Sequence, residues 1–123
     1  MKLTKNRQQI YETIFNSKVP LSAYDISSLL ENISLTTVYR ALDYLQKEGR
    51  IKYIVINDFK YYYSTEVHQH FFQCIKCKKL FTLNACFIQP YEQYIENNMG
   101  FKITEHLVFF SGICKNCQRE EQK

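Results

Sequence analysis

Apolar and polar positions in the first fifty residues follow the period of an α-helix. A first helix is predicted from about Thr4, whose hydroxyl suits an N-cap, and Pro20 separates it from the next element because proline disfavours helix at the residue before it. The apolar stripe of this helix consists of Ile10, Tyr11, Ile14 and Phe15.

Two further helices are predicted, each with a recognisable cap. Ser22 and Asp25 have the spacing of a capping box, and Ser34 suits the N-cap of the third helix. Gly49 is placed to end that helix, with Lys47 near the negative end of its dipole. The predicted core positions are Ile26, Leu29 and Leu30 in the second helix and Val38, Ala41, Leu42 and Leu45 in the third.

Residues 51–63 change to a pattern rich in β-branched and aromatic side chains. Asn57 and Asp58 form a turn signal between two apolar runs, which predicts a β-hairpin. Three helices followed by a hairpin is the order of a winged helix-turn-helix domain. A small helical domain with an attached hairpin has the same order, so the pattern alone leaves both open.

The second half predicts a strand, a helix and a strand between two CxxC motifs. Residues 80–83 suit a strand, and Pro90 suits the first turn of a helix that runs to about Met99, with Gly100 as its C-terminal stop. Residues 101–111 suit a second strand. We therefore predict an α+β chain, with a winged-helix domain over 1–64 and a small α/β domain over 65–123.

Composition excludes several classes of protein. The 123 residues are 46% hydrophobic and 23% charged, as in ordinary globular domains, and no apolar run approaches the roughly 18–20 residues that span a bilayer. The N-terminus has no secretory h-region, so we expect a cytoplasmic protein without a membrane partner. The net charge of +4 leans toward residues 1–63, which hold nine basic and six acidic residues, and permits a polyanionic partner.

Four of the five cysteines form two CxxC pairs separated by 36 residues. Each pair can present two thiolates from one tight turn, and two such turns make a tetrahedral cage of the kind that Zn²⁺ takes. The competing interpretation is a thiol redox protein, in which one CxxC begins a helix. The predicted structural zinc ligands are Cys74, Cys77, Cys114 and Cys117.

The polar face of the third helix carries side chains suited to DNA. Hydroxyls of Thr36, Thr37 and Tyr39 can bond phosphates, and the Arg40 guanidinium can contact phosphate or a guanine edge. Lys5 is a secondary candidate for a backbone contact. No Ser–His–carboxylate constellation or glycine-rich phosphate loop is evident, so we expect neither an enzyme nor a small organic substrate.

Segments along nearly the whole chain resemble the ferric uptake regulator family. They are LTKNRQQI, PLSAYDISSLL, ISLTTVYRALDYLQKEGRI, an HxH segment and the two CxxC motifs, and the pairing of AYD with TVYRALDYL favours the zinc uptake regulator branch. The resemblance implies a homodimer, formed by the second domain, that binds a palindromic operator in double-stranded DNA. It also implies a metal-homeostasis repressor that senses Zn²⁺ or Fe²⁺ at a second, regulatory metal site.

The HxH segment supplies the first candidates for that regulatory site. His68 and His70 share one face of a strand, which suits chelation, and His106 or Glu66 can complete the site. An ungapped alignment with the family pattern puts Gln69 and Phe71 at the ligand places instead. Cys86, the fifth cysteine, suits either a small buried apolar position or a sensory thiolate.

The sequence departs from the family pattern where regulatory ligands are usual. Pro20, Tyr62 and Thr82 occupy places where the family often has histidine, glutamate or cysteine, and Lys52 stands at the place of a wing histidine. One alternative is therefore a metal-insensitive DNA-binding dimer with structural zinc only. Another is a zinc-ribbon adaptor that binds protein or RNA.

Overall fold

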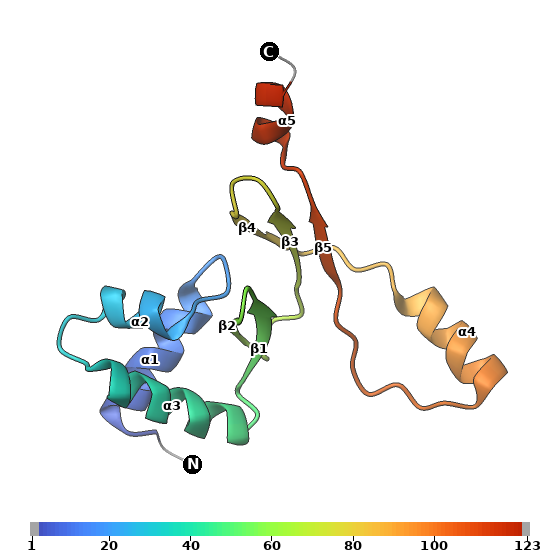
Figure 1. Cartoon of the computed structure of the whole chain (residues 1–123). Helices are drawn as coiled ribbons and strands as arrows, with labels where there is room; N and C mark the ends of the chain where they lie inside the picture. The colour runs from blue at the N-terminus through green and yellow to red at the C-terminus, as the bar shows by residue number, and fades with distance from the viewer. Residues whose placement is uncertain (1–2, 122–123) are drawn as a thin grey trace. The chain divides into compact units, whose positions relative to one another are not determined.

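A computed structural model describes residues 3–121, which form two compact units that divide between Val67 and His68. In the N-terminal unit, three helices precede a two-stranded antiparallel sheet (Figure 1). The elements are α1 (Lys5–Asn16), α2 (Ala23–Leu29), α3 (Leu35–Lys47), β1 (Ile51–Ile56) and β2 (Phe59–Ser64). The predicted winged-helix order is confirmed.

The helix caps form as the sequence predicts. Thr4 accepts a hydrogen bond from the Arg7 N–H, and Ser34 accepts one from the Thr37 N–H. Ser22 and Asp25 form both hydrogen bonds of a capping box, at 3.1 and 2.9 Å. Each cap satisfies backbone donors that the first turn of a helix leaves without partners.

The apolar faces of the three helices pack against one another and against the hairpin to form the core of this unit. All four predicted core positions of α3 are buried, but Leu29 of α2 is 61% exposed, so its predicted burial is wrong. Phe15, on the apolar stripe of α1, is 44% exposed. Phe15 stacks on Tyr11, which itself fills the core. Leu29 ends a helix of only seven residues, which presents just its Ala23 and Ile26 side to the core.

The hairpin turn has the backbone that its residues favour. Asn57 and Asp58 have φ values of 51° and 70°, the left-handed pair of a tight turn whose twist matches the strands. The strands pair from Ile51 with Ser64 to Ile56 with Phe59. Leu21 and Tyr62 exchange two backbone hydrogen bonds of 3.0 and 2.7 Å, which fasten the hairpin beside the start of α2.

In the C-terminal unit, β3 (His70–Cys74) is the central strand of three. It pairs antiparallel with β4 (Leu80–Leu83) and parallel with β5 (Phe109–Gly112). Between β4 and β5 the chain makes an excursion that carries α4 (Gln89–Met99), and α5 (Lys115–Glu121) follows β5 (Figure 1). Gly100 ends α4 in the left-handed region at φ 70°, as predicted.

The strand predicted over residues 101–111 is much shorter in the structure. Only β5 is a strand, because β3 begins at His70 and offers pairing partners only from Phe71 to Cys74. The segment from 101 to 108 is irregular. Within the described residues no helix has the length and apolar character to cross a bilayer, α3 being the longest at 13 residues.

Candidate metal centres and nucleic-acid interface

Two turns at one end of the C-terminal sheet bring the four CxxC cysteines together. Cys74 ends β3, and its carbonyl accepts a hydrogen bond from the N–H of Lys78, which has a left-handed φ of 66°. The Cys77 and Cys114 N–H groups both point at the Cys74 sulfur, at 3.5 and 3.4 Å. Parallel pairing of Cys74 with Gly112 places the second CxxC beside the first.

The spacing of the sulfurs fits one tetrahedral ion. The four Sγ atoms lie within 4.8 Å of one another, and those of Cys77 and Cys114 are 3.8 Å apart. Ligands at about 2.3 Å from zinc are separated by about 3.8 Å along the edge of a tetrahedron. A disulfide needs about 2.05 Å, and all five cysteines are free thiols. We call Cys74, Cys77, Cys114 and Cys117 the tetrathiolate cage.

The shifted pKa values of the cage thiols also favour a bound cation. Hydrogen bonds from backbone N–H groups, that of Cys114 above all, lower the pKa of the Cys74 thiol to about 6. The neighbouring Cys114 side chain, followed by desolvation, raises the pKa of Cys117 to about 12. Four adjacent thiols cannot all ionise on their own, and a divalent ion at their centre removes that conflict.

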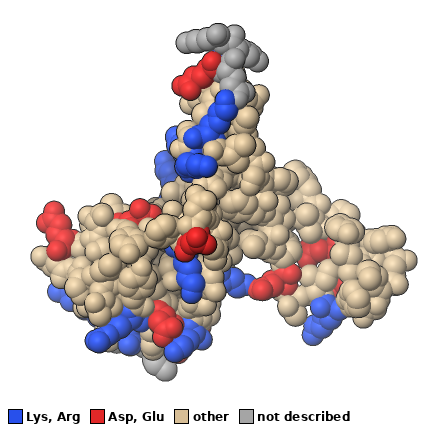
Figure 2. All heavy atoms as spheres, viewed as in Figure 1, with Lys and Arg blue, Asp and Glu red and all other residues tan. Residues whose placement is uncertain are grey.

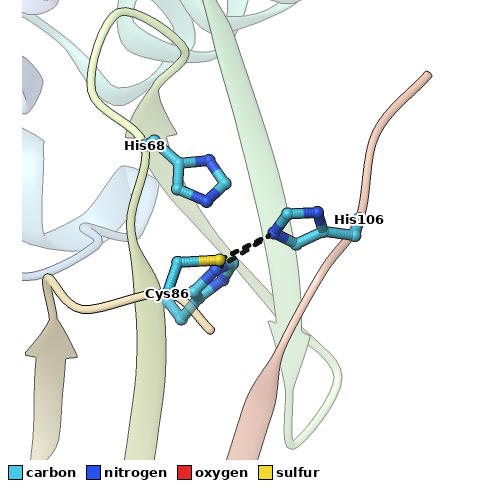
Figure 3. Close-up of side chains that lie close together, drawn as sticks. His68, Cys86 and His106 are labelled. Carbon is cyan, nitrogen blue, oxygen red and sulfur yellow. Dashed lines mark hydrogen bonds between the residues drawn. The ribbon is translucent and has the colours of Figure 1, made fainter. Parts of the chain in front are cut away.

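A second cluster gathers three imidazoles and one thiol from separate segments of the same unit. His68 precedes β3, His70 begins it, Cys86 follows β4, and His106 precedes β5. Their potential ligand atoms all lie within 4.8 Å of one another. Figure 3 shows the His68 ring, the Cys86 sulfur and the His106 ring turned toward a common centre.

The distances in this histidine–cysteine cluster, as we call these four residues, suit a small ion. Nε2 of His106 lies 3.2 Å from Nε2 of His70 and 3.3 Å from Sγ of Cys86. Two nitrogens bound at about 2.05 Å to one tetrahedral zinc are about 3.3 Å apart. The residues present therefore fit a tetrahedral metal.

His70 is the buried member of the cluster. Its side chain is only 3% exposed, and its Nδ1 has no hydrogen-bond partner among the described residues. Burial, followed by the nearby His68 and His106, lowers the pKa of His70. The ring therefore stays neutral, which is the form that binds metal.

A carboxylate from α4 supports the cluster from outside. Oε2 of Glu92 lies 3.2 Å from Nδ1 of His106, and both side chains are about four-fifths buried, with exposed fractions of 23% and 19%. Glu92 therefore fixes which nitrogen of His106 faces the other ligands. The sequence reasoning missed Glu92, whose signal was only its place on the helix ahead of a candidate histidine.

Three of the four predicted regulatory residues, His68, His70 and His106, lie together in the structure. The fourth member of their cluster is Cys86 and not Glu66, which lies in the N-terminal unit. Antiparallel pairing of His70 with Leu83 explains this, because it brings the chain just after β4 to the start of β3. Phe71, a ligand place in the ungapped alignment, is fully buried.

The candidate DNA face of α3 is exposed except for one threonine. Thr36, Tyr39 and Arg40 are open to solvent, as is Lys5 at the start of α1. Thr37 is half-buried and accepts a hydrogen bond from the Ser34 hydroxyl at 3.0 Å, so it belongs to the cap. Tyr39 borders a cavity of about 430 Å³ between α2, α3 and the hairpin.

Charge on the N-terminal unit is mixed. On the face shown in Figure 2, Lys and Arg side chains are interspersed with Asp and Glu and form no single broad basic patch. Some basic groups are engaged: Arg7 stacks over the Tyr44 ring at 3.7 Å, and Lys47 pairs with Asp43 at 3.0 Å. Arg40 on α3 is exposed.

Comparisons with known proteins agree with this arrangement. The family model described as the ferric uptake regulator family matches residues 1–111. The peroxide operon regulator of Bacillus subtilis (strain 168) is 28% identical, with 98% of this chain and 87% of the relative covered. The ferric uptake regulation protein of the same strain is 30% identical, with the same coverage.

The fold also has close counterparts among solved structures. The structure of the Helicobacter pylori ferric uptake regulator Fur, described as having three functional metal-binding sites, superposes with a TM-score of 0.79. It is 23% identical and covers 96% of this chain and 83% of its own. Because the family model spans most of the chain and a relative 30% identical covers nearly all of it, the chain belongs to the ferric uptake regulator family, whose members are metal-responsive transcriptional regulators and not enzymes.

Proposed function

We propose that this protein is a homodimeric repressor that binds a palindromic operator when metal occupies the histidine–cysteine cluster. The observation that carries the proposal is the presence of two separate ligand clusters in one small unit. One is an all-thiolate cage suited to a structural ion. The other mixes imidazoles with a thiol, and its His68 is exposed.

We propose Zn²⁺ for both clusters. Thiolate and imidazole are the donors that zinc prefers, whereas Mn²⁺ and Mg²⁺ prefer oxygen ligands. Cys86 adds a soft donor that favours zinc over Fe²⁺, and the AYD and TVYRALDYL segments point to the zinc branch. Because the relatives include peroxide and iron regulators, Fe²⁺ is the alternative that a metal titration has to exclude.

The two clusters have different roles in this proposal. The tetrathiolate cage fastens the ends of the C-terminal unit together. All four thiolates are used, so this zinc has no open position for chemistry. At the second cluster His68, His70, Cys86 and His106 hold the regulatory ion, and the free energy of that binding favours the DNA-competent arrangement.

The N-terminal unit supplies the DNA contacts. We propose that residues 1–64 bind DNA and residues 65–123 form the dimer, so that two α3 helices enter successive major grooves. Tyr39 and Arg40 contact base edges or phosphates, and Thr36 and Lys5 contact the backbone. Thr37, whose hydroxyl is engaged in the cap, holds the first turn of α3 that presents them.

A metal-dependence experiment tests the regulatory site. Operator affinity is measured with zinc buffered at defined free concentrations, for wild type, for His68→Ala with His70→Ala, and for Gln69→Ala as a matched control between them. Zinc is expected to strengthen DNA binding by wild type and the control, while the double variant loses the response and keeps the tight zinc. Wild-type binding that ignores added or chelated weak metal would show the proposal to be wrong.

One observation favours a second candidate function. Pro20, Tyr62 and Thr82 stand where the family often has histidine, glutamate or cysteine, so a regulatory site here cannot have the usual composition of that family. Tyr62 is instead buried and paired with Leu21, and Thr82 pairs with Phe71 in the sheet. A metal-insensitive DNA-binding dimer is therefore the alternative that the same zinc titration distinguishes.

A substitution on α3 tests the DNA face. Arg40→Ala is expected to cost about 1–3 kcal/mol of operator binding and to relax discrimination at one base pair if Arg40 reads a base. If it holds phosphate, binding falls for all sequences and the salt slope falls by about one. Lys47→Ala, whose partner is Asp43, is the control; equal affinity of Arg40→Ala and wild type contradicts the assignment.

A further inference from the structure

Helix α4 is almost unsupported by apolar packing. None of its eleven residues is buried, and only Glu92 and Ile95 are half-buried. Its aromatic side chains Tyr91 and Tyr94 stack on each other and are 62% and 61% exposed. Within one chain, hydrophobic burial, which fixes most helices in proteins, therefore does little to hold this one in place.

Contacts between polar side chains instead join the two segments that flank α4, where the chain leaves β4 and returns to β5. Cys86 lies three residues before α4 and His106 seven residues after it, and their side chains meet at 3.3 Å. From within the helix, Glu92 reaches His106 at 3.2 Å. One turn later, Glu96 accepts a hydrogen bond from the Ile103 N–H at 3.2 Å and is not among the four residues of the cluster.

A metal ion bound by the residues on either side of α4 would have two physical consequences. An ion that binds Cys86 and His106 closes the loop of 19 residues between them and removes conformational freedom from everything inside it. A carboxylate behind a ligating histidine fixes the tautomer and ring orientation, and its loss typically weakens metal binding about 10–100-fold.

We propose that Glu92 is the positioning residue of the histidine–cysteine cluster, and that metal bound there fastens α4 through the Cys86–His106 closure. This inference rests on the proposed function and identifies the element that the regulatory ion controls. In the loaded protein α4 is held at three points: its two flanking ligands and its own carboxylate. In the metal-free protein the helix remains tethered by weaker contacts and opens more often.

Hydrogen exchange of the full-length protein tests the fastening. Amide exchange across residues 89–99 is followed before and after Zn²⁺ fills the second site, with the zinc of the tetrathiolate cage retained throughout. Wild-type α4 amides are expected to exchange at least about tenfold more slowly when the site is loaded. Amides of α1, in the other unit, serve as the internal reference and are expected to change less than about twofold.

Two substitutions on the same helix test the positioning role. Glu92→Gln is expected to weaken Zn²⁺ binding at the second site about 10–100-fold. It is also expected to alter the visible absorption of Co²⁺ bound there, because His106 is no longer held in one orientation. Glu96→Gln, the matched control one turn away, is expected to leave both readouts as in wild type. Equal melting temperatures of the metal-free variants show that the effect is not general unfolding.

The outcomes separate this inference from the proposed function. If wild type binds the second ion and gains DNA affinity, yet α4 exchange does not slow or Glu92→Gln binds zinc as wild type does, the inference is overturned and the proposed function stands. If wild type binds no second ion, both fail. If Glu92→Gln weakens zinc and Glu96→Gln weakens it equally, the effect belongs to the helix as a whole and the positioning role is overturned.

Discussion

The two metal-ligand clusters of the C-terminal unit are built on different principles. The ligands of the tetrathiolate cage come from two CxxC turns, joined by backbone hydrogen bonds and by the pairing of β3 with β5. The ligands of the histidine–cysteine cluster come from the start of β3 and from two irregular segments that flank α4. A cage supported by the backbone is fixed once the sheet forms, whereas the second cluster also depends on irregular segments outside the sheet.

The two clusters would also differ in net charge once each holds a divalent ion. Four thiolates around one divalent ion leave a net charge of −2, which nearby Lys76, Lys78, Lys79 and Lys115 offset. Three neutral imidazoles and one thiolate leave +1. Because thiolates bind zinc more strongly than imidazoles at neutral pH, we expect the tighter ion in the cage and the exchangeable ion in the second cluster.

The largest expected effect is the loss of the ion in the tetrathiolate cage. Structural zinc contributes about 10–16 kcal/mol of apparent binding free energy, which is also folding free energy. Cys74→Ser is therefore expected to lose the tight zinc and to unfold or monomerise the protein, as measured by elemental analysis, circular dichroism and light scattering. Cys86→Ser is the control and should keep one tight zinc per chain. A dimeric Cys74→Ser protein with native melting behaviour would remove the distinction between the clusters.

Withdrawal of the second ion alone is expected to cost far less. At a free metal concentration of about 100 times Kd, a ligand stabilises the folded state by about 2.7 kcal/mol. A chelator of moderate strength should therefore lower the melting temperature by a few degrees, leave the dimer intact and remove one metal per chain. Simultaneous loss of both ions at one chelator strength would show that the two clusters have similar affinities.

Replacement of the Cys86 thiol by a carboxylate tests which metal ion the second cluster prefers. Cys86→Asp converts the cluster to three imidazoles and a hard oxygen donor, which is better suited to Mn²⁺ or Fe²⁺. Its ratio of Zn²⁺ to Mn²⁺ affinity is expected to fall about tenfold, or about 1.4 kcal/mol, in competitive titrations. An unchanged ratio would mean that Cys86 does not ligate the ion.

The smallest expected effect is the pH dependence of the metal-free protein. Because burial lowers the pKa of His70, the unfolded chain takes up its proton at a higher pH than the folded one does. This contribution to stability is complete above the unfolded histidine pKa of about 6.5 and is lost as pH falls below it. Denaturant unfolding from about pH 8 to about pH 5 should show the decline, and His70→Gln should flatten it. A decline of the same size in His70→Gln would assign it to other groups.

Affinity of the second site for metal should follow pH in the same direction. Imidazoles bind metal only when neutral, so affinity should fall more steeply once the pH passes below about 6.5. Isothermal titrations in buffers of different ionisation enthalpy count the protons released. Fewer protons are expected per ion at about pH 7.5 than at about pH 6, because metal binding releases the protons that its ligands still carry at the lower pH.

Much of this protein is specified by interactions between residues close in sequence. The capping box of Ser22 and Asp25, the left-handed turn at Asn57 and Asp58, and the stop at Gly100 each depend on a few neighbouring positions, and all form as predicted. The clustering of the four CxxC cysteines could be predicted because each CxxC is local and two of them suffice for a cage. Membership in the family follows from the same order of local signals.

Tertiary structure alone decided the composition of the second cluster and the burial of the amphipathic faces. Cys86 joins His70 because β4 pairs with β3, and His106 joins them because β5 lies on the other side of the same strand. Glu92 enters only because α4 folds back toward His106. Phe15 and Leu29, apolar at helical spacing, remain exposed because α1 and α2 each present only part of their apolar stripe to the core. Periodicity and capping record interactions within about one helical turn, whereas pairing between distant strands, such as β3 with β5, leaves no periodic signal in the chain.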